Sequence, residues 1–167
     1  MDNFRLWILA LLLCSPAAYP LSGPVVATEN VKARLVSETD AIGPGQSVSV
    51  ALELNIREGW HTYWRNPGDS GQATSIVWNL PAGFTASGIS WPAPHRFELA
   101  PLVNYGYARH VMLLVKITAP KILPQTPAAE LQAKASWLVC ADVCVPEEAQ
   151  LNLRLPQGPV AAPPAPD

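Results

Sequence analysis

Cys140 and Cys144 are separated by only three residues and stand between two segments with strand-like alternation. A strand that enters Cys140 and another that leaves Cys144 predict a hairpin with residues 141–143 as its loop. Facing residues where a hairpin closes have Cα atoms about 4.5–5.5 Å apart, inside the range of about 4.4–6.8 Å that a disulfide needs. The spacing therefore predicts two thiols that can form and open a disulfide without a change of fold.

A purely structural disulfide is the alternative for the same two residues. A bridge across so short a loop removes little chain entropy, because the stabilisation grows with loop length. The acidic residues Asp142, Glu147 and Glu148 lie close by in the sequence and disfavour a thiolate. Cys144 is therefore expected to react only when a partner has docked, and both interpretations stay open on the residues alone.

Alternating apolar and polar residues predict short strands along most of the chain. The clearest is 47–56, and the others are 31–36, 60–64, 74–80, 84–91, 105–118, 129–140 and 149–155. Turn signals separate these segments, and none of them has a helical period. About eight short strands predict an all-β fold, an immunoglobulin-like β-sandwich with a CxxxC hairpin. Segments 66–71 and 92–101 are expected to be loops.

The beginning of the chain has the pattern of a signal peptide. Arg5 precedes an unbroken apolar run at 6–13, and small residues and prolines follow. Cleavage is expected after Ala17 or Ala18, or later after Ala27, and lipidation of Cys14 is the alternative. We assign 1–27 to the signal peptide, 28–155 to the β-sandwich domain and 156–167 to a Pro/Ala-rich tail or truncated linker. Export would place the remaining cysteines where disulfides form and persist.

The charge balance excludes some classes of partner. The chain has 11 Lys+Arg against 13 Asp+Glu, a net charge of −2, with no basic patch, so we expect no nucleic-acid partner. No Ser/His/Asp set, phosphate loop or paired carboxylate arrangement stands out. Exchange between a dithiol and a disulfide needs no cofactor, so we expect none. We also expect no resident metal ion, because Zn²⁺ would want four ligands and only two cysteines and scattered histidines are available.

Three motifs in order resemble one family of exported redox domains. They are the cysteine hairpin 137–147, the segment Gly59–Gly71 that contains Trp-His-Thr-Tyr-Trp, and Trp91-Pro92-Ala93-Pro94 with the following 102–107. Together they resemble the N-terminal periplasmic domain of the thiol:disulfide interchange protein DsbD family, in the branch that includes the copper-sensitivity suppressor protein ScsB. The resemblance covers about residues 29–155.

This resemblance implies a thiol:disulfide oxidoreductase of the protein-disulfide reductase type, located in the periplasm. Such a domain takes electrons from a thioredoxin-fold donor and passes them to periplasmic client proteins. In DsbD, a membrane-embedded domain passes electrons to this thioredoxin-like donor. Because this chain ends where the membrane and thioredoxin-like domains would begin, it is expected to be either a stand-alone relay domain or a shortened gene product.

The resemblance also implies roles for individual residues. The second cysteine, Cys144, would form the mixed disulfide with partners, and Cys140 would be the resolving cysteine. The segment 92–107 would form a cap over the pair, with Phe97 or Tyr105 as the shielding aromatic residue. His61 and Tyr63 belong to a motif expected near the pair, where a ring could donate a hydrogen bond to sulfur, although cross-strand packing is the alternative for both.

Two other functions are left open by the sequence. Two thiolates, His61 and the soft ligand Met112 could bind Cu(I), which fits the copper tolerance associated with the ScsB branch. A structural sandwich used in adhesion or assembly would need neither thiol. His95 and His110 are expected at the surface, and Asp69 is expected to cap its own turn.

Overall fold

The structure is a computed structural model that describes residues 20–99 and 101–158. Residues 1–19 and 159–167 lie outside the described residues, and with them most of the predicted signal peptide, Cys14 and most of the predicted tail. Because the described residues form strands, turns and loops, this part of the chain holds no helix that is long and apolar enough to cross a membrane.

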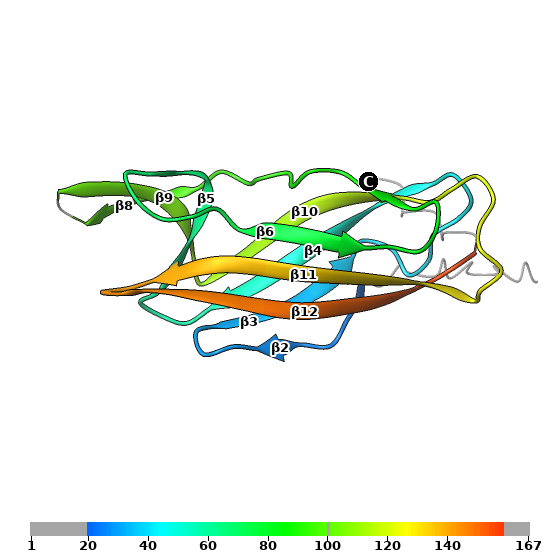
Figure 1. Ribbon diagram of the computed structural model, residues 1–167, viewed down its shortest axis with the longest axis horizontal. Coiled ribbons are helices and arrows are strands. Elements are labelled where there is room, and N and C mark those ends of the chain that lie inside the picture. Colours follow the sequence, from blue (N-terminus) through cyan, green and yellow to red (C-terminus); the bar gives the residue numbers. More distant parts are fainter. Residues whose placement is uncertain (1–19, 100, 159–167) are drawn as a thin grey trace, which may run out of the picture.

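Two antiparallel sheets form an immunoglobulin-like β-sandwich, as predicted (Figure 1). The first sheet has the order β1-β3-β4-β10-β7, and β2 also pairs with β3. Its strands are β1 (Leu21–Ser22), β2 (Val26–Ala27), β3 (Val31–Ser37), β4 (Ser47–Ile56), β7 (Thr85–Ala86) and β10 (His110–Thr118). The second sheet has the order β12-β11-β5-β9-β8, and β6 also pairs with β11. Its strands are β5 (His61–Gly68), β6 (Ser75–Asn79), β8 (His95–Leu99), β9 (Leu102–Ala108), β11 (Ala128–Cys140) and β12 (Cys144–Pro156).

The core lies between the two sheets and is made by the apolar positions of alternating strands. Along β10, for example, the residues alternate between buried and exposed over nearly the whole strand. The side chains of Leu52, Leu54, Leu113, Leu131 and Leu153 are completely or almost completely buried. Such burial of apolar surface is the main favourable contribution to folding, so the alternation in the sequence also determines which face of each strand points inward.

Several strand boundaries differ from the sequence prediction. The segment expected as one strand at 105–118 is two strands, β9 and β10, because Arg109 between them adopts a left-handed backbone conformation with φ of 63°. The segment 92–101, expected to be a loop, contains β8, which forms a hairpin with β9. Of the strand expected at 84–91, only β7 is present, and the strand expected at 60–64 extends through β5 to Gly68.

Two short strands lie before the predicted domain boundary. Both β1 and β2 pair with β3, and they fall within the region 1–27 that the sequence analysis assigns to the signal peptide. At the other boundary, Pro156 still belongs to β12, and Gln157 forms a bridge with Ile42.

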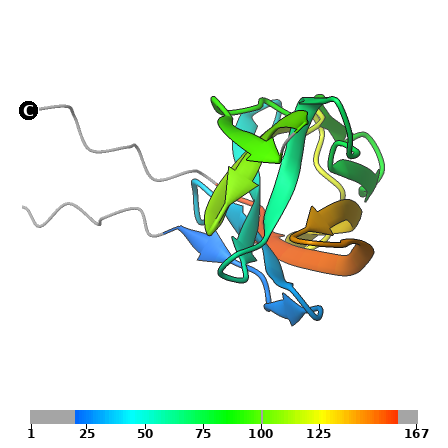
Figure 2. The ribbon, with the colours of Figure 1, turned by 90° about the vertical axis from the view of Figure 1, so that its left-hand side faces the viewer.

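The cysteine hairpin and the β8–β9 hairpin lie at the same end of the sandwich. In Figure 1 both reach toward the left, and Figure 2 faces that end. Strand β5 connects them, because it pairs with β9 on one side and with the end of β11 on the other. The fold therefore brings three sequence motifs to one place.

Candidate active site at the cysteine hairpin

Cys140 and Cys144 form a disulfide across the closing pair of the β11–β12 hairpin, as the spacing predicted. Their Cα atoms are 4.1 Å apart, slightly closer than the expected separation. The loop between them is closed by a hydrogen bond from the Ala141 N–H to the Val143 carbonyl. The two cysteines differ in their access to solvent, because Cys140 is only 1% exposed and Cys144 is an exposed residue.

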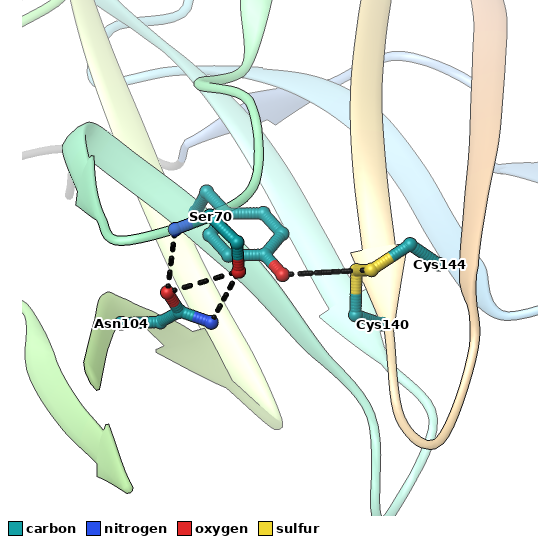
Figure 3. The surroundings of a disulfide bond; sticks show 5 residues. Ser70, Asn104, Cys140 and Cys144 are labelled. Carbon is teal, nitrogen blue, oxygen red and sulfur yellow. Dashed lines mark hydrogen bonds between the residues drawn. A yellow bond between two sulfur atoms is a disulfide. The ribbon is translucent and has the colours of Figure 1, made fainter. Parts of the chain in front are cut away.

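Tyr63 on β5 contacts the disulfide from the buried side. Its hydroxyl donates a hydrogen bond to the Cys140 Sγ over 3.0 Å, drawn in Figure 3 as the dashed line that reaches Cys140. The same oxygen lies 3.6 Å from the Cys144 Sγ. Burial raises the pKa of Tyr63, with the Ser70 hydroxyl acting in the opposite direction. The phenol therefore stays protonated at neutral pH and remains a hydrogen-bond donor to sulfur.

The loop after β5 holds Tyr63 in place. Gly71 lies against the Tyr63 ring so closely that a Cβ at this position would be 2.2 Å from a ring carbon. Ser70 is bound to the buried Asn104 on β9, whose side chain accepts from the Ser70 N–H and exchanges hydrogen bonds with its hydroxyl (Figure 3). Asp69 does not cap its own turn, because its carboxylate accepts a hydrogen bond from the Val103 N–H at 2.8 Å.

His61 lies opposite Cys140 in the β5–β11 pairing. Its ring stacks on Phe97 of β8, with centroids 4.6 Å apart, and meets the Tyr63 ring edge-on at 5.2 Å. Burial lowers the pKa of His61, and its Nε2 has no hydrogen-bond partner among the described residues. His61 is therefore a neutral ring above pH 7, held between two aromatic side chains.

Phe97 and the disulfide loop border the same hollow in the surface. The hollow has a volume of about 720 Å³, and its lining includes His61, Phe97, Ala141 and Asp142. Tyr105, the other aromatic residue expected in the cap, is partly buried on β9 opposite Arg96 and does not line this hollow. The structure thus brings His61, Tyr63 and Phe97 together beside the cysteines.

The family model described as "Thiol:disulfide interchange protein DsbD, N-terminal" matches residues 32–156. The chain belongs to this DsbD N-terminal domain family. Its place there agrees with the resemblance drawn from the three motifs, and with the disulfide that the two cysteines form.

The fold also resembles solved structures. The crystal structure of the N-terminal periplasmic domain of ScsB from Proteus mirabilis aligns with a TM-score of 0.62 and 22% sequence identity, over 82% of this chain and 52% of that chain. The chain thus spans about half the length of that structure. The yeast GGA1 GAE domain aligns with a TM-score of 0.45 and 10% identity, over 80% of this chain and 97% of that chain. No curated protein matches the chain.

Met112, the fourth ligand suggested for a copper site, lies in the other sheet from the two cysteines. It is on β10 of the first sheet, 40% exposed, and lines a separate hollow with Val36 and Leu114. The structure therefore does not bring Met112 to the cysteines. His95 and His110 are exposed, and His110 contacts Glu53 at 3.0 Å.

Sequence reasoning misses the side chains that support the site. Ser70, Gly71 and Asn104 lie inside the motifs that carry the family resemblance, so the motifs mark them without indicating a role. Glu147 stands out in the sequence only as a nearby negative charge, whereas its carboxylate accepts hydrogen bonds from Thr28, Asn30 and Trp137.

Proposed function

We propose that this domain relays electrons in the periplasm by cycling the Cys140–Cys144 pair between dithiol and disulfide. The observation that carries the proposal is the unequal exposure of the two sulfurs, with Cys144 exposed and Cys140 buried under Tyr63. Because exchange requires access to the attacked sulfur, a partner thiolate would reach Cys144 first. The family membership supports the same chemistry.

The exchange proceeds in two balanced steps. A partner thiolate attacks the Cys144 Sγ, the Sγ–Sγ bond breaks, and Cys140 leaves as a thiolate that accepts the Tyr63 hydrogen bond. The partner's second thiolate then attacks its own sulfur in the mixed disulfide and releases Cys144 as a thiolate. The partner is thereby oxidised to a disulfide, and the domain is reduced to a dithiol that takes up protons from solvent. Reversal of these steps on a client disulfide reduces the client.

Tyr63 supports this cycle by stabilising the leaving group, the Cys140 thiolate. A hydrogen bond to a charged acceptor is stronger than one between neutral groups, so it stabilises the Cys140 thiolate more than the disulfide sulfur. Thiols with a more stable thiolate leave faster in disulfide exchange. The nearby carboxylates oppose the thiolate less than their charges alone suggest. Glu148 pairs with Lys134 at 2.8 Å, and Glu147 accepts hydrogen bonds.

The β8–β9 hairpin would serve as the cap of the pair, with Phe97 as its shielding residue. Phe97 stacks on His61 at the border of the hollow beside residues 141 and 142. A docking partner would enter this hollow to reach Cys144. We propose thioredoxin-fold proteins as donors and periplasmic thiol-disulfide proteins as clients, together with a DsbD- or ScsB-like membrane domain that supplies the electrons.

Trapping of the mixed disulfide tests the assignment. Cys140→Ser keeps the exposed thiol and removes the resolving one, whereas Cys144→Ser does the reverse. Each variant is mixed with the disulfide form of a thioredoxin-fold protein or, separately, with glutathione disulfide. The fraction of protein that carries an adduct is measured by mass spectrometry. We expect a stable adduct with Cys140→Ser and little or none with Cys144→Ser. Equal trapping by both variants, or preferential trapping by Cys144→Ser, would overturn the assignment.

A further inference from the structure

Glu147 on β12 is held by an unusual number of hydrogen bonds for a partly exposed carboxylate. Its Oε1 accepts from the Asn30 N–H at 3.0 Å and from the Asn30 Nδ2 at 2.9 Å. Its Oε2 accepts from the Trp137 Nε1 at 3.2 Å and from the Thr28 hydroxyl. Four donors therefore converge on one carboxylate three residues after Cys144. Hydrogen bonds to an ionised acceptor are about twice as strong as neutral ones.

Three of these donors, from Thr28 and Asn30, belong to a hydrogen-bonded turn between β2 and β3. Asn30 is 2% exposed, the Thr28 N–H donates to the Val31 carbonyl at 2.9 Å, and the Val31 N–H donates to the Thr28 hydroxyl oxygen at 3.3 Å. The carboxylate thus joins the strand that begins at Cys144 to a fixed part of the first sheet. Glu148, the next residue, lacks this environment, because its carboxylate is 61% exposed and pairs only with Lys134 in the described part of the chain.

Near its cysteine end, the backbone of the hairpin pairs little with other strands. On its inner side, β11 pairs with β6 over Gln132–Ser136 and with β5 only at Cys140. In the described part of the chain, the backbone of residues 137–139 therefore pairs only with β12, the last strand of its sheet, while the side chains of Trp137 and Val139 pack into the core. Trp137 and Glu147 face each other at this level of the ladder. The contact with Thr28 and Asn30, here called the brace, adds side-chain hydrogen bonds between this level and the first sheet to that core packing.

We propose that Glu147 is a positioning residue that sets the redox equilibrium of the cysteine pair by holding the end of the hairpin in register. When the disulfide opens, the braced hairpin keeps the two sulfurs facing each other, so their effective concentration stays high. A looser hairpin would let the thiols separate, and re-formation of the disulfide would become less favourable. The inference rests on the proposed function, in which the pair is opened and closed.

Glu147→Gln, Thr28→Val and the control Glu148→Gln test this role. Glutamine keeps the shape of Glu147 but replaces one acceptor oxygen by an NH₂ group that faces donors. Thr28→Val removes the hydroxyl that donates to Glu147 and accepts from the Val31 N–H, without a change of charge or of shape. Glu148→Gln removes the same charge from the neighbouring residue and leaves the brace intact. Glu53→Gln, which disturbs a buried carboxylate bound to Arg34 and His110 in the first sheet, controls for lost stability alone.

Each purified protein is equilibrated with glutathione and glutathione disulfide, and the oxidised fraction is read by mass after alkylation. Oxidation of the two cysteine thiols reduces one glutathione disulfide to two glutathione molecules. We expect Glu147→Gln to lower the equilibrium constant for disulfide formation at least threefold, a potential about 14 mV less negative. Thr28→Val should shift it in the same direction, and the two control variants should match the wild type.

Three outcomes would overturn the inference. An equal shift in Glu147→Gln and Glu148→Gln would show an effect of charge. No shift in Thr28→Val would show that the brace is not involved. A shift in Glu53→Gln would show a general effect of stability. If Glu147→Gln does not fold, Thr28→Val carries the test alone. The inference is tested by the difference in potential between the variants and the wild type. The absolute potential of the wild type tests the proposed function separately.

Discussion

At the scale of single residues, the hydroxyl of Tyr63 is the group that most directly affects the buried sulfur. Tyr63→Phe keeps the ring against Gly71 and removes only the hydroxyl, with its hydrogen bond to Cys140 and its contact with Cys144. A hydrogen bond to a charged group contributes about 1.5–3 kcal/mol, and about 1.4 kcal/mol corresponds to a factor of ten in rate. We therefore expect reduction of the disulfide by a small dithiol to be about tenfold slower at fixed pH. An unchanged rate in a variant with an unchanged fold would contradict a role in stabilising the leaving group.

His61 gives a second residue-scale prediction, which concerns pH. Burial lowers its pKa in the folded protein, so the unfolded chain binds the proton more readily. The stabilisation is therefore complete above the unfolded pKa of about 6.5 and is lost as the pH falls from there through the lowered folded pKa. One such group contributes a slope of at most about 1.4 kcal/mol per pH unit.

His61→Phe keeps an aromatic ring for stacking on Phe97 and cannot be protonated. We expect the free energy of unfolding, measured by urea denaturation between pH 7.5 and 5, to fall less steeply in this variant than in the wild type. His95 and His110 are present in both proteins, so the difference between the two curves isolates His61. Parallel curves would show that the buried ring does not control the acid sensitivity.

The residues that carry chemistry can be predicted from the sequence because cysteine spacing and aromatic motifs are local signals. The disulfide and the hairpin follow directly from three intervening residues between two alternating segments. The hydrogen bonds of Glu147 cannot be predicted in this way. They require the turn at Thr28 and Asn30 to lie beside β12, more than a hundred positions later in the chain, and no local pattern indicates such a contact.

At the scale of elements, the loop after β5 positions Tyr63 through a glycine. Gly71 has a φ of 97°, and an added Cβ would overlap the Tyr63 ring. Gly59→Ala is a matched control, because Gly59 also has a positive φ, 83°, with no atom within 4 Å of the added Cβ. Both variants incur the backbone cost of about 1–2 kcal/mol, and only Gly71→Ala adds overpacking of about 1–3 kcal/mol.

We expect Gly71→Ala to be less stable than Gly59→Ala by about 1–3 kcal/mol, the cost of overpacking. We also expect slower reduction of its disulfide, because the Tyr63 ring is displaced. Urea denaturation and the rate of reduction by dithiol measure the two effects. Equal stability and equal rates in the two variants would show that the loop does not constrain Tyr63.

The β8–β9 hairpin is the element assigned to the cap. Phe97→Ala removes the ring that stacks on His61 and opens the hollow beside the disulfide loop. We expect glutathione to reduce the disulfide several-fold faster in this variant. Leu102→Ala, which removes a 40% exposed side chain from the same hairpin, should not change the rate. Equal rates in Phe97→Ala and the wild type would remove Phe97 from the cap.

Two features of the strands escape sequence analysis for identifiable reasons. Strand β8 has the charged residues Arg96 and Glu98 and follows two prolines, so it lacks the apolar alternation that marks a half-buried strand. It forms through pairing with β9, a tertiary contact. The break at Arg109 has no glycine, proline or asparagine to signal a left-handed residue.

At the scale of the whole molecule, the sandwich presents the cysteine pair at one end, where it closes the β11–β12 hairpin beside the β8–β9 hairpin. The fold class could be predicted from the sequence because the core strands alternate apolar and polar residues, a pattern that each strand carries by itself. The prediction of a signal peptide at 1–27 stays a prediction. Cleavage after Ala17 or Ala18 would keep β1 and β2, which pair with β3, whereas cleavage after Ala27 would remove both.

The reduction potential of the Cys140–Cys144 pair tests the central claim most directly. The mature protein is equilibrated in graded thiol/disulfide buffers, and the alkylated fraction is read by mass. Disulfide-exchange proteins lie between about −120 and −270 mV, whereas structural disulfides of secreted proteins typically lie below about −300 mV. We predict a value within the range of exchange proteins. A value well below about −300 mV would contradict the relay and make the bridge a structural disulfide.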